Sequence, residues 1–148
     1  MLLRLSTIAL SAAAIGALTG QAAGSPAISL KPKTKICGQI KHGPYASYRS
    51  LLSGKTIKGT TWTVFSTGIP CKTTMKVAPA VLKWWKTAKV DGHKTVKGFL
   101  CGKENDGKGH SGTTGCVPTK SGYPALSNFE LIMTGKYTLA QIRSIFGG

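Results

Sequence analysis

The sequence predicts a small single α+β domain, in which a short antiparallel sheet packs on one main helix and two disulfides hold the chain together. Three observations predict this fold class. One long segment has the apolar periodicity of a helix, several short segments rich in β-branched and aromatic residues surround it, and four cysteines form an even set. Once residues 1–24 are set aside, 124 residues remain, enough for one compact domain.

Residues 1–24 have the layout of a secretory signal peptide. A positive start at Arg4 precedes an apolar, alanine-rich run over 5–18, and small residues follow as a cleavage site. The run is shorter than the roughly 20 residues that span a bilayer, so a membrane anchor is the weaker alternative. Cleavage after Ala22 and cleavage after Gly24 fit equally well. We therefore expect a secreted protein, extracellular or held in the cell envelope.

The first half of the mature chain predicts an extended arm over 25–33 and then the domain over 34–148. A first strand is expected over 34–41. The clearest strand covers 60–67, where β-branched and aromatic residues alternate and the threonines suit a face turned to water. The segment 45–52 is compatible with a short helix or with an irregular loop.

The main helix is predicted over 68–86. On a period of 3.6 residues, one stripe faces the core and the next stripe round is a row of lysines. The core stripe contains Cys71, Met75, Ala78, Leu82 and Trp85, and the lysine row contains Lys72, Lys76, Lys83 and Lys86. Trp84 is then nearer the surface than Trp85. Pro79 predicts either a kink or a break into two helices.

The second half predicts two more strands, a hairpin and a closing helix. A strand over 95–101 leads into a glycine-rich loop over 102–115, and a returning strand from Cys116 makes a wide hairpin. A last strand is expected over 129–133. The closing helix over 138–146 starts with a capping box formed by Thr138 and Gln141. The residues expected on its apolar side are Leu139, Ile142, Ile145 and Phe146.

The four cysteines favour two disulfides, because an even set in an exported chain is usually oxidised. Three pairings are possible. We assign Cys101 to Cys116, which closes a local loop, and Cys37 to Cys71, which ties an early strand to the helix start. A zinc site is the alternative, but no pair has the short Cys-x-x-Cys spacing. We expect no metal and no other cofactor.

The charge predicts an anionic partner. Without residues 1–24 the chain has 19 lysines and arginines against 4 acidic residues, a net charge of +15, and 17 of the 19 are lysines. Arginine is the side chain that reads base edges and grips phosphate with two bonds, whereas lysine is a mobile point charge. The bias indicates diffuse attraction to a charged surface. The plainer alternative is that the charge serves solubility.

The lysine row and Trp84 are the candidate binding residues, namely Lys72, Lys76, Lys83, Lys86 and Trp84. A tryptophan beside lysines can stack on sugar rings or bases, or lie in a lipid headgroup layer. The leading hypothesis is a non-enzymatic domain that associates, without sequence specificity, with cell-wall polymers, anionic lipid or extracellular nucleic acid. A protein partner is also possible.

An enzyme is the rival hypothesis. Glu104, Asp106 and His110 lie together in the glycine-rich loop, so His110 with Glu104 could serve a small secreted nuclease or cell-wall hydrolase. The simpler interpretation is a polar turn, which the sequence favours because no familiar catalytic motif is present.

Two resemblances add expectations. One pattern runs from Trp62-Thr63-Val64 to Gly68-Ile69-Pro70-Cys71 and continues later with Gly98-Phe99-Leu100-Cys101 and Cys116. It resembles the pattern of small exported bacterial disulfide-containing domains of unknown function. This resemblance implies an exported disulfide domain and carries no known active site. A second pattern consists of Phe129-Glu130-Leu131-Ile132 followed by residues 135–142. It is similar to the strand-turn-helix repeats of β-lactamase-inhibitory proteins and outer-membrane assembly lipoproteins. That likeness implies a protein inhibitor or partner-binding module.

Overall fold

The computed structural model describes residues 33–49, 54–105 and 111–146. The expected signal peptide and all but the last residue of the expected arm therefore lie outside the described residues. Over the described ranges the elements, in chain order, are β1 (Thr34–Ile40), β2 (Ala46–Arg49), β3 (Thr56–Gly59), β4 (Trp62–Thr67), α1 (Cys71–Thr87), β5 (His93–Val96), β6 (Phe99–Lys103), β7 (Thr113–Pro118), β8 (Asn128–Met133) and α2 (Leu139–Phe146).

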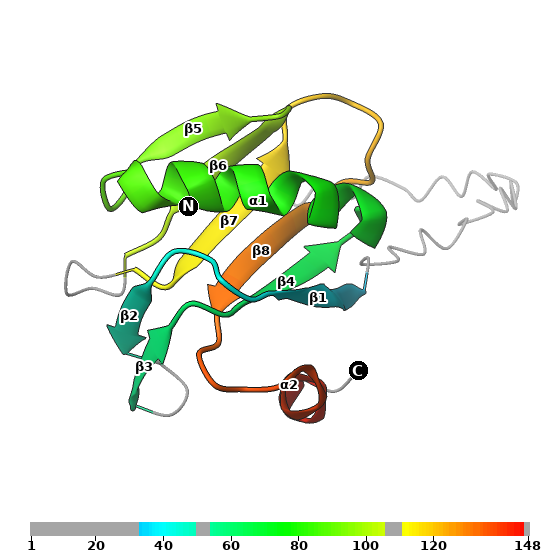
Figure 1. Cartoon of the computed structure of the whole chain (residues 1–148). Coiled ribbons are helices and arrows are strands. Elements are labelled where there is room, and N and C mark those ends of the chain that lie inside the picture. The colour runs from blue at the N-terminus through cyan, green and yellow to red at the C-terminus, as the bar shows by residue number, and fades with distance from the viewer. Residues whose placement is uncertain (1–32, 50–53, 106–110, 147–148) are drawn as a thin grey trace, which may run out of the picture.

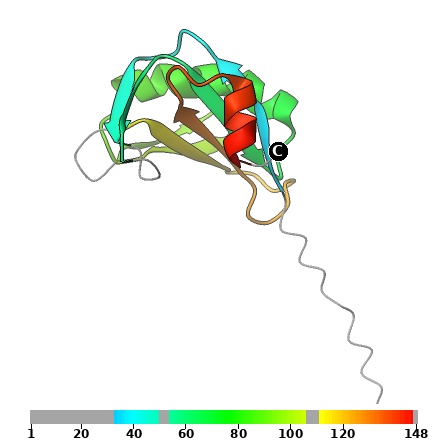
Figure 2. The ribbon, with the colours of Figure 1, turned by 90° about the horizontal axis from the view of Figure 1, so that it is seen from below.

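A six-stranded antiparallel sheet with the order β1-β4-β8-β7-β6-β5 forms the centre of the molecule. The 17-residue helix α1 crosses one face of this sheet, and α2 lies beside its β1 edge (Figures 1 and 2), where Phe146 contacts Phe65 of β4. β2 and β3 form a separate hairpin. The predicted fold class, a small α+β domain with one main helix, is confirmed.

The core fills the space between α1 and the sheet. Trp62 of β4 and Leu131 of β8 are fully buried, and Val81 of α1 meets them from the helix side. The rings of Trp62 and Trp85 contact edge to face, with their centroids 4.8 Å apart. Each large apolar side chain buried in this way contributes about 1.5 to 3 kcal/mol, so packing on α1 is what stabilises the sheet.

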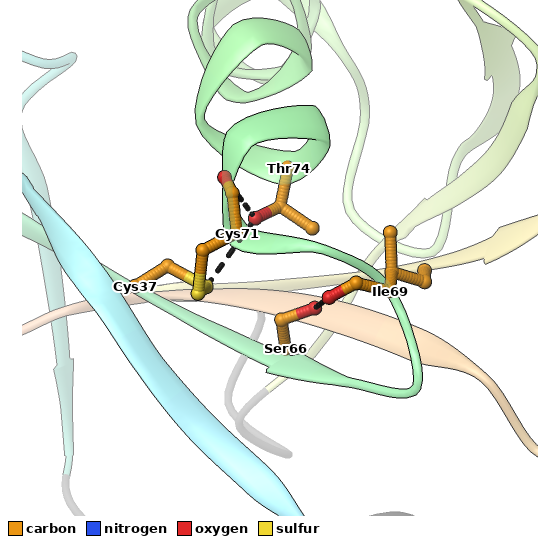
Figure 3. Close-up of a disulfide and its surroundings, with 5 residues drawn as sticks. All are labelled: Cys37, Ser66, Ile69, Cys71 and Thr74. Carbon is orange, nitrogen blue, oxygen red and sulfur yellow. Dashed lines mark hydrogen bonds between the residues drawn. A yellow bond between two sulfur atoms is a disulfide. The ribbon is translucent and has the colours of Figure 1, made fainter.

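Both predicted disulfides are present. Cys37 is bonded to Cys71, which joins β1 to the first turn of α1 (Figure 3). Cys37 occupies a bulge in β1, where the pairing with β4 shifts between Ile36 and Gly38. Cys101 is bonded to Cys116, its direct neighbour across β6 and β7. Two disulfides indicate an oxidising, non-cytoplasmic location. Within the described ranges, no helix has the length and apolar character needed to cross a membrane.

The turn into α1 is held by side-chain hydrogen bonds (Figure 3). Gly68 takes a positive φ of 70°, and the Ser66 hydroxyl donates to the carbonyl oxygen of Ile69 over 2.7 Å. The Thr74 hydroxyl donates to the carbonyl oxygen of Cys71 over 3.0 Å and lies 3.4 Å from the Cys37 sulfur. These contacts fix where the helix begins and in which direction it leaves the sheet.

The helix α1 runs through Pro79 without a break, so the expectation of a second helix starting there was wrong. Pro79 is exposed on the outer side of α1. Its ring therefore does not disturb the packing of the buried side, although the helix lacks the hydrogen bond that an N–H group at position 79 would donate.

Two strand assignments differ from the predictions. The segment 45–52 is neither helix nor irregular loop where it is described, because β2 pairs with β3. Tyr48 of β2 packs so closely on Gly112 that a Cβ there would come within 1.9 Å of the ring. The segment 95–101 is two strands, because Lys97 and Gly98 both have positive φ, 48° and 84°, and turn the chain back in a tight hairpin.

The side of the sheet next to α2 is less exposed to solvent than predicted. Thr63 is fully buried, and its hydroxyl shares a 2.9 Å hydrogen bond with that of Thr134. The predicted capping box of α2 forms between Thr138 and Gln141. Ile142 is buried, but Ile145 is 57% exposed, which corrects its assignment to the apolar side. The threonine face is thus covered by the chain that leads into α2.

Candidate anion-binding groove

The four predicted lysines lie along the outer side of α1, and all four are exposed. The predicted core stripe was partly wrong, because Cys71 and Met75 are only half-buried. The buried residues of α1 are Thr74, Val77, Ala78, Val81, Leu82 and Trp85. The buried side is thus turned away from Met75, and at 100° per residue the lysines lie opposite the core instead of beside it. The row is therefore the most outward part of the helix.

A groove between the second half of α1 and the edge strand β5 is lined by four lysines. Its volume is about 690 Å³, and it is lined by Ala80, Lys83, Trp84, Lys86, Thr87, Lys94, Thr95, Val96 and Lys97. We call it the α1–β5 groove. Two of the predicted lysines, Lys83 and Lys86, line the groove from α1. Lys94 and Lys97, which were not singled out from the sequence, line it from the side of β5. None of the described residues that line it is acidic.

The pairing of β5 with β6 explains how Lys94 reaches this groove. Lys94 is opposite Cys101 and Val96 is opposite Phe99, and both partners face α1 in the core. Register partners share a face of an antiparallel sheet, so Lys94 and Val96 also point toward α1. Val96 is buried under the helix, whereas Lys94 is exposed and lines the groove. Lys97 lies beside it in the hairpin turn.

Trp84 is the accessible tryptophan. The chain has three tryptophans, of which Trp62 is 0% and Trp85 5% exposed. Trp84 is half-buried, packs against the core and lines the groove. The prediction that Trp85 joins the core and Trp84 lies nearer the surface is confirmed. An indole in this position gives the basic groove an apolar wall.

Lys103 fixes the end of α1 that forms the groove. Its ammonium donates to the carbonyl oxygens of Trp85 and Ala88 over 3.1 and 2.9 Å, and it lies 4.1 Å from the centroid of the Trp85 ring. A cation at a helix C-terminus also meets the negative end of the helix dipole. Burial lowers the pKa of Lys103. These contacts give Lys103 a structural role at the end of α1.

A second hollow adjoins the lysine row on the side of α1 that faces β1. Its volume is about 310 Å³, and it is lined by Ile40, His42, Gly43, Pro44, Pro79, Leu82, Lys83 and Lys86. Lys83 and Lys86 therefore stand on the ridge between two hollows. Lys72 and Lys76 line neither hollow and extend the basic surface toward the start of the helix.

The one described residue of the predicted enzymatic site, Glu104, is not among the residues that line the groove. Glu104 is exposed beyond the end of β6, and one of its oxygens accepts a 2.8 Å hydrogen bond from the Thr113 hydroxyl. Asp106 and His110 lie outside the described residues, so the pairing of His110 with Glu104 stays a prediction. The neighbour of Glu104 that the sequence did not suggest is Glu130 of β8. Burial raises the pKa of Glu130, and the negative charge of Glu104 raises it further.

Comparisons with known proteins found no similar chain: no family model, curated protein or solved structure matches at a significant level. The two resemblances therefore stay expectations. Within the part of the chain that the structure describes, no three histidine, cysteine or acidic side chains gather as a metal site would require. The basic groove remains the site with the clearest chemistry.

Proposed function

We propose that this protein is an exported, non-enzymatic domain that binds anionic polymers or surfaces through the lysine side of α1. The observation that supports the proposal best is the α1–β5 groove, where Lys83 and Lys86 of the helix and Lys94 and Lys97 of the strand side line one hollow together with Trp84, and none of its described lining residues is acidic. Lysine ammonium groups bind phosphate, sulfate and carboxylate groups as mobile point charges. The groove therefore suits a repeating anion better than one fixed small molecule.

The net charge supports the same function. A domain with a charge of +15 attracts polyanions over long distances and associates with them quickly. Each phosphate neutralised by a lysine releases bound counterions, so affinity falls as salt rises, with a logarithmic slope of about −0.7 per contact on a single strand. Four lysines in contact would give a slope of about −3. The ligands that fit are cell-wall polymers, anionic lipid and extracellular nucleic acid.

Salt dependence is the direct test. Affinity of the disulfide-bonded protein for dextran sulfate, an oligonucleotide and phosphatidylglycerol vesicles is measured by titration at low and at high salt. We expect at least one ligand to bind with an affinity that falls about 10-fold or more. If every ligand bound equally at both salt concentrations, or none bound at all, the proposal would be wrong.

Matched variants locate the binding surface. Lys83→Gln/Lys86→Gln removes two charges from the groove. Lys58→Gln/Lys136→Gln removes two exposed charges around the contact between β3 and the turn after β8, away from α1. We expect the first pair to lower affinity about 10-fold and the second by less than about threefold. Equal losses would mean that only the net charge matters.

A further inference from the structure

We infer that the α1–β5 groove binds single-stranded nucleic acid, with an unpaired base stacked against Trp84 and the neighbouring phosphates on the lysines of the two walls. This inference rests on the proposed function and adds the class of ligand. It depends on three features of the groove: the position of the Trp84 indole, the arrangement of the lysines around it, and the absence of arginine, asparagine and glutamine among the described lining residues.

The indole of Trp84 is recessed. It is half-buried and packed against the core, whereas Lys83 and Lys86 on the helix and Lys94 and Lys97 on the strand are exposed around it. A lipid surface is broad, so it would contact these lysines first and leave the ring untouched. An aromatic side chain that enters a membrane interface has to project from the protein surface. The recessed position therefore favours a narrow ligand that can enter the groove.

An unpaired base is such a ligand. A flat ring on a flexible strand can enter a cavity of about 690 Å³, a size within the usual range for small-molecule sites. In a duplex the bases are stacked and paired, and their faces are not available to Trp84. Single-strand binding sites commonly combine a basic groove along the backbone with an aromatic side chain for the bases. The α1–β5 groove has both parts.

The absence of arginine among the lining residues gives the expected specificity. Base edges are read best by arginine, asparagine and glutamine, and none of the described residues that line the groove is one of these. Stacking is tolerant of sequence, because every base has an aromatic face. We therefore expect different homopolymeric strands to bind within a few-fold of one another, with a preference for single strands over duplexes.

The decisive experiment compares oligothymidylate with an abasic phosphodiester strand of the same length. Both carry the same phosphates, but only one carries bases. We expect oligothymidylate to bind about 10-fold more tightly, because one stacked base contributes about that factor. Trp84→Leu should remove the advantage and leave the affinity for the abasic strand unchanged. Trp84→Phe, which keeps an aromatic ring, should retain part of it.

Tryptophan fluorescence gives an independent signal. Because Trp62 and Trp85 are buried, quenching by a stacked base should come from Trp84 and disappear in Trp84→Leu. Unfolding curves of each variant identify any that fails to fold, and Trp84→Phe then serves as the test.

Each outcome separates the two proposals. Equal affinity for both strands, without dependence on Trp84, overturns the inference and leaves general polyanion binding intact. A Trp84-dependent preference for duplex DNA or for phosphatidylglycerol vesicles also overturns it. If neither strand, nor dextran sulfate, nor vesicles bind, the proposed function fails as well.

Discussion

The two faces of the sheet differ in the charge of the residues on them and in whether α1 packs against them. The face toward α1 contains the core and both disulfides, and lysines cover the outer side of its helix. On β5 to β8 the opposite face, which we call the bare face, has no lysine or arginine among its described strand residues. These are His93, Thr95, Leu100, Gly102, Thr113, Gly115, Val117, Asn128, Glu130 and Ile132.

This difference shows that, among the described residues of α1 and of β5 to β8, the lysines gather on the α1 side of the sheet. A coat that served solubility alone would have no reason to avoid one face. Instead, Glu104 and Glu130, two of the four acidic residues, are neighbours on the side away from α1. Leu100 and Val117 are 43% and 47% exposed there. The asymmetry favours a directed role for the lysines over the simple solubility alternative.

Removing the disulfides should have the largest effect, because both join elements on the α1 side. Cys37→Ala/Cys71→Ala opens a link across 34 residues and should cost about 4 kcal/mol of unfolding free energy. Cys101→Ala/Cys116→Ala opens one across 15 residues and should cost about 3 kcal/mol. On the bare face, Val117→Thr should change stability by less than about 0.5 kcal/mol. Denaturant titration measures all three, and a large loss for Val117→Thr would contradict the assigned roles of the two faces.

Charge removal on each face should change binding by an intermediate amount. Glu104→Gln/Glu130→Gln raises the net charge by the same amount by which Lys83→Gln/Lys86→Gln lowers it. If the α1 side binds the ligand, the lysine pair should lower affinity for oligothymidylate about 10-fold, while the glutamate pair raises it less than about threefold, since distant charges are screened. Effects of equal size and opposite sign in the same titration would show that net charge alone governs binding.

The smallest expected effect is a pH dependence on the bare face. The pKa of Glu130 is raised above its ordinary value of 4.5, so ionisation is less favourable in the folded state than in the unfolded state. Folding therefore loses stability as pH rises through the raised pKa. Glu130→Gln should resist denaturant better than the natural protein at neutral pH, and this advantage should shrink below pH 4.5. An advantage that is the same at both pH values would indicate a cause other than ionisation.

The parts of the fold that sequence predicted are those with strong local signals. The strand around Trp62, the helix from Cys71 and the capping box of α2 each depend on residues close together in the chain. The strand β2 has no such signal, because its position depends on Tyr48 packing over the distant Gly112. The hairpin at Lys97 and Gly98 was missed because lysine replaces the asparagine or aspartate that usually marks this turn.

The candidate site was found only in part, for the same reason. Helical periodicity identified Lys83 and Lys86, since their spacing places them off the expected core stripe of α1, and it separated Trp84 from the buried Trp85. Lys94 and Lys97 belong to the site only because β5 lies beside the helix, which is a tertiary contact. Recognising the hairpin turn would have placed β5 as a separate edge strand and directed attention to both lysines.

The two ends of α1 are each fastened to the sheet, by the Cys37–Cys71 bond at the start and by Lys103 at the finish. Because α1 is held at both ends, the helix side of the α1–β5 groove needs little rearrangement before a ligand binds. Most of the entropy lost on association would then be that of the flexible strand itself. Amide hydrogen exchange along the helix should accordingly be slow already in the free protein and change little in the complex.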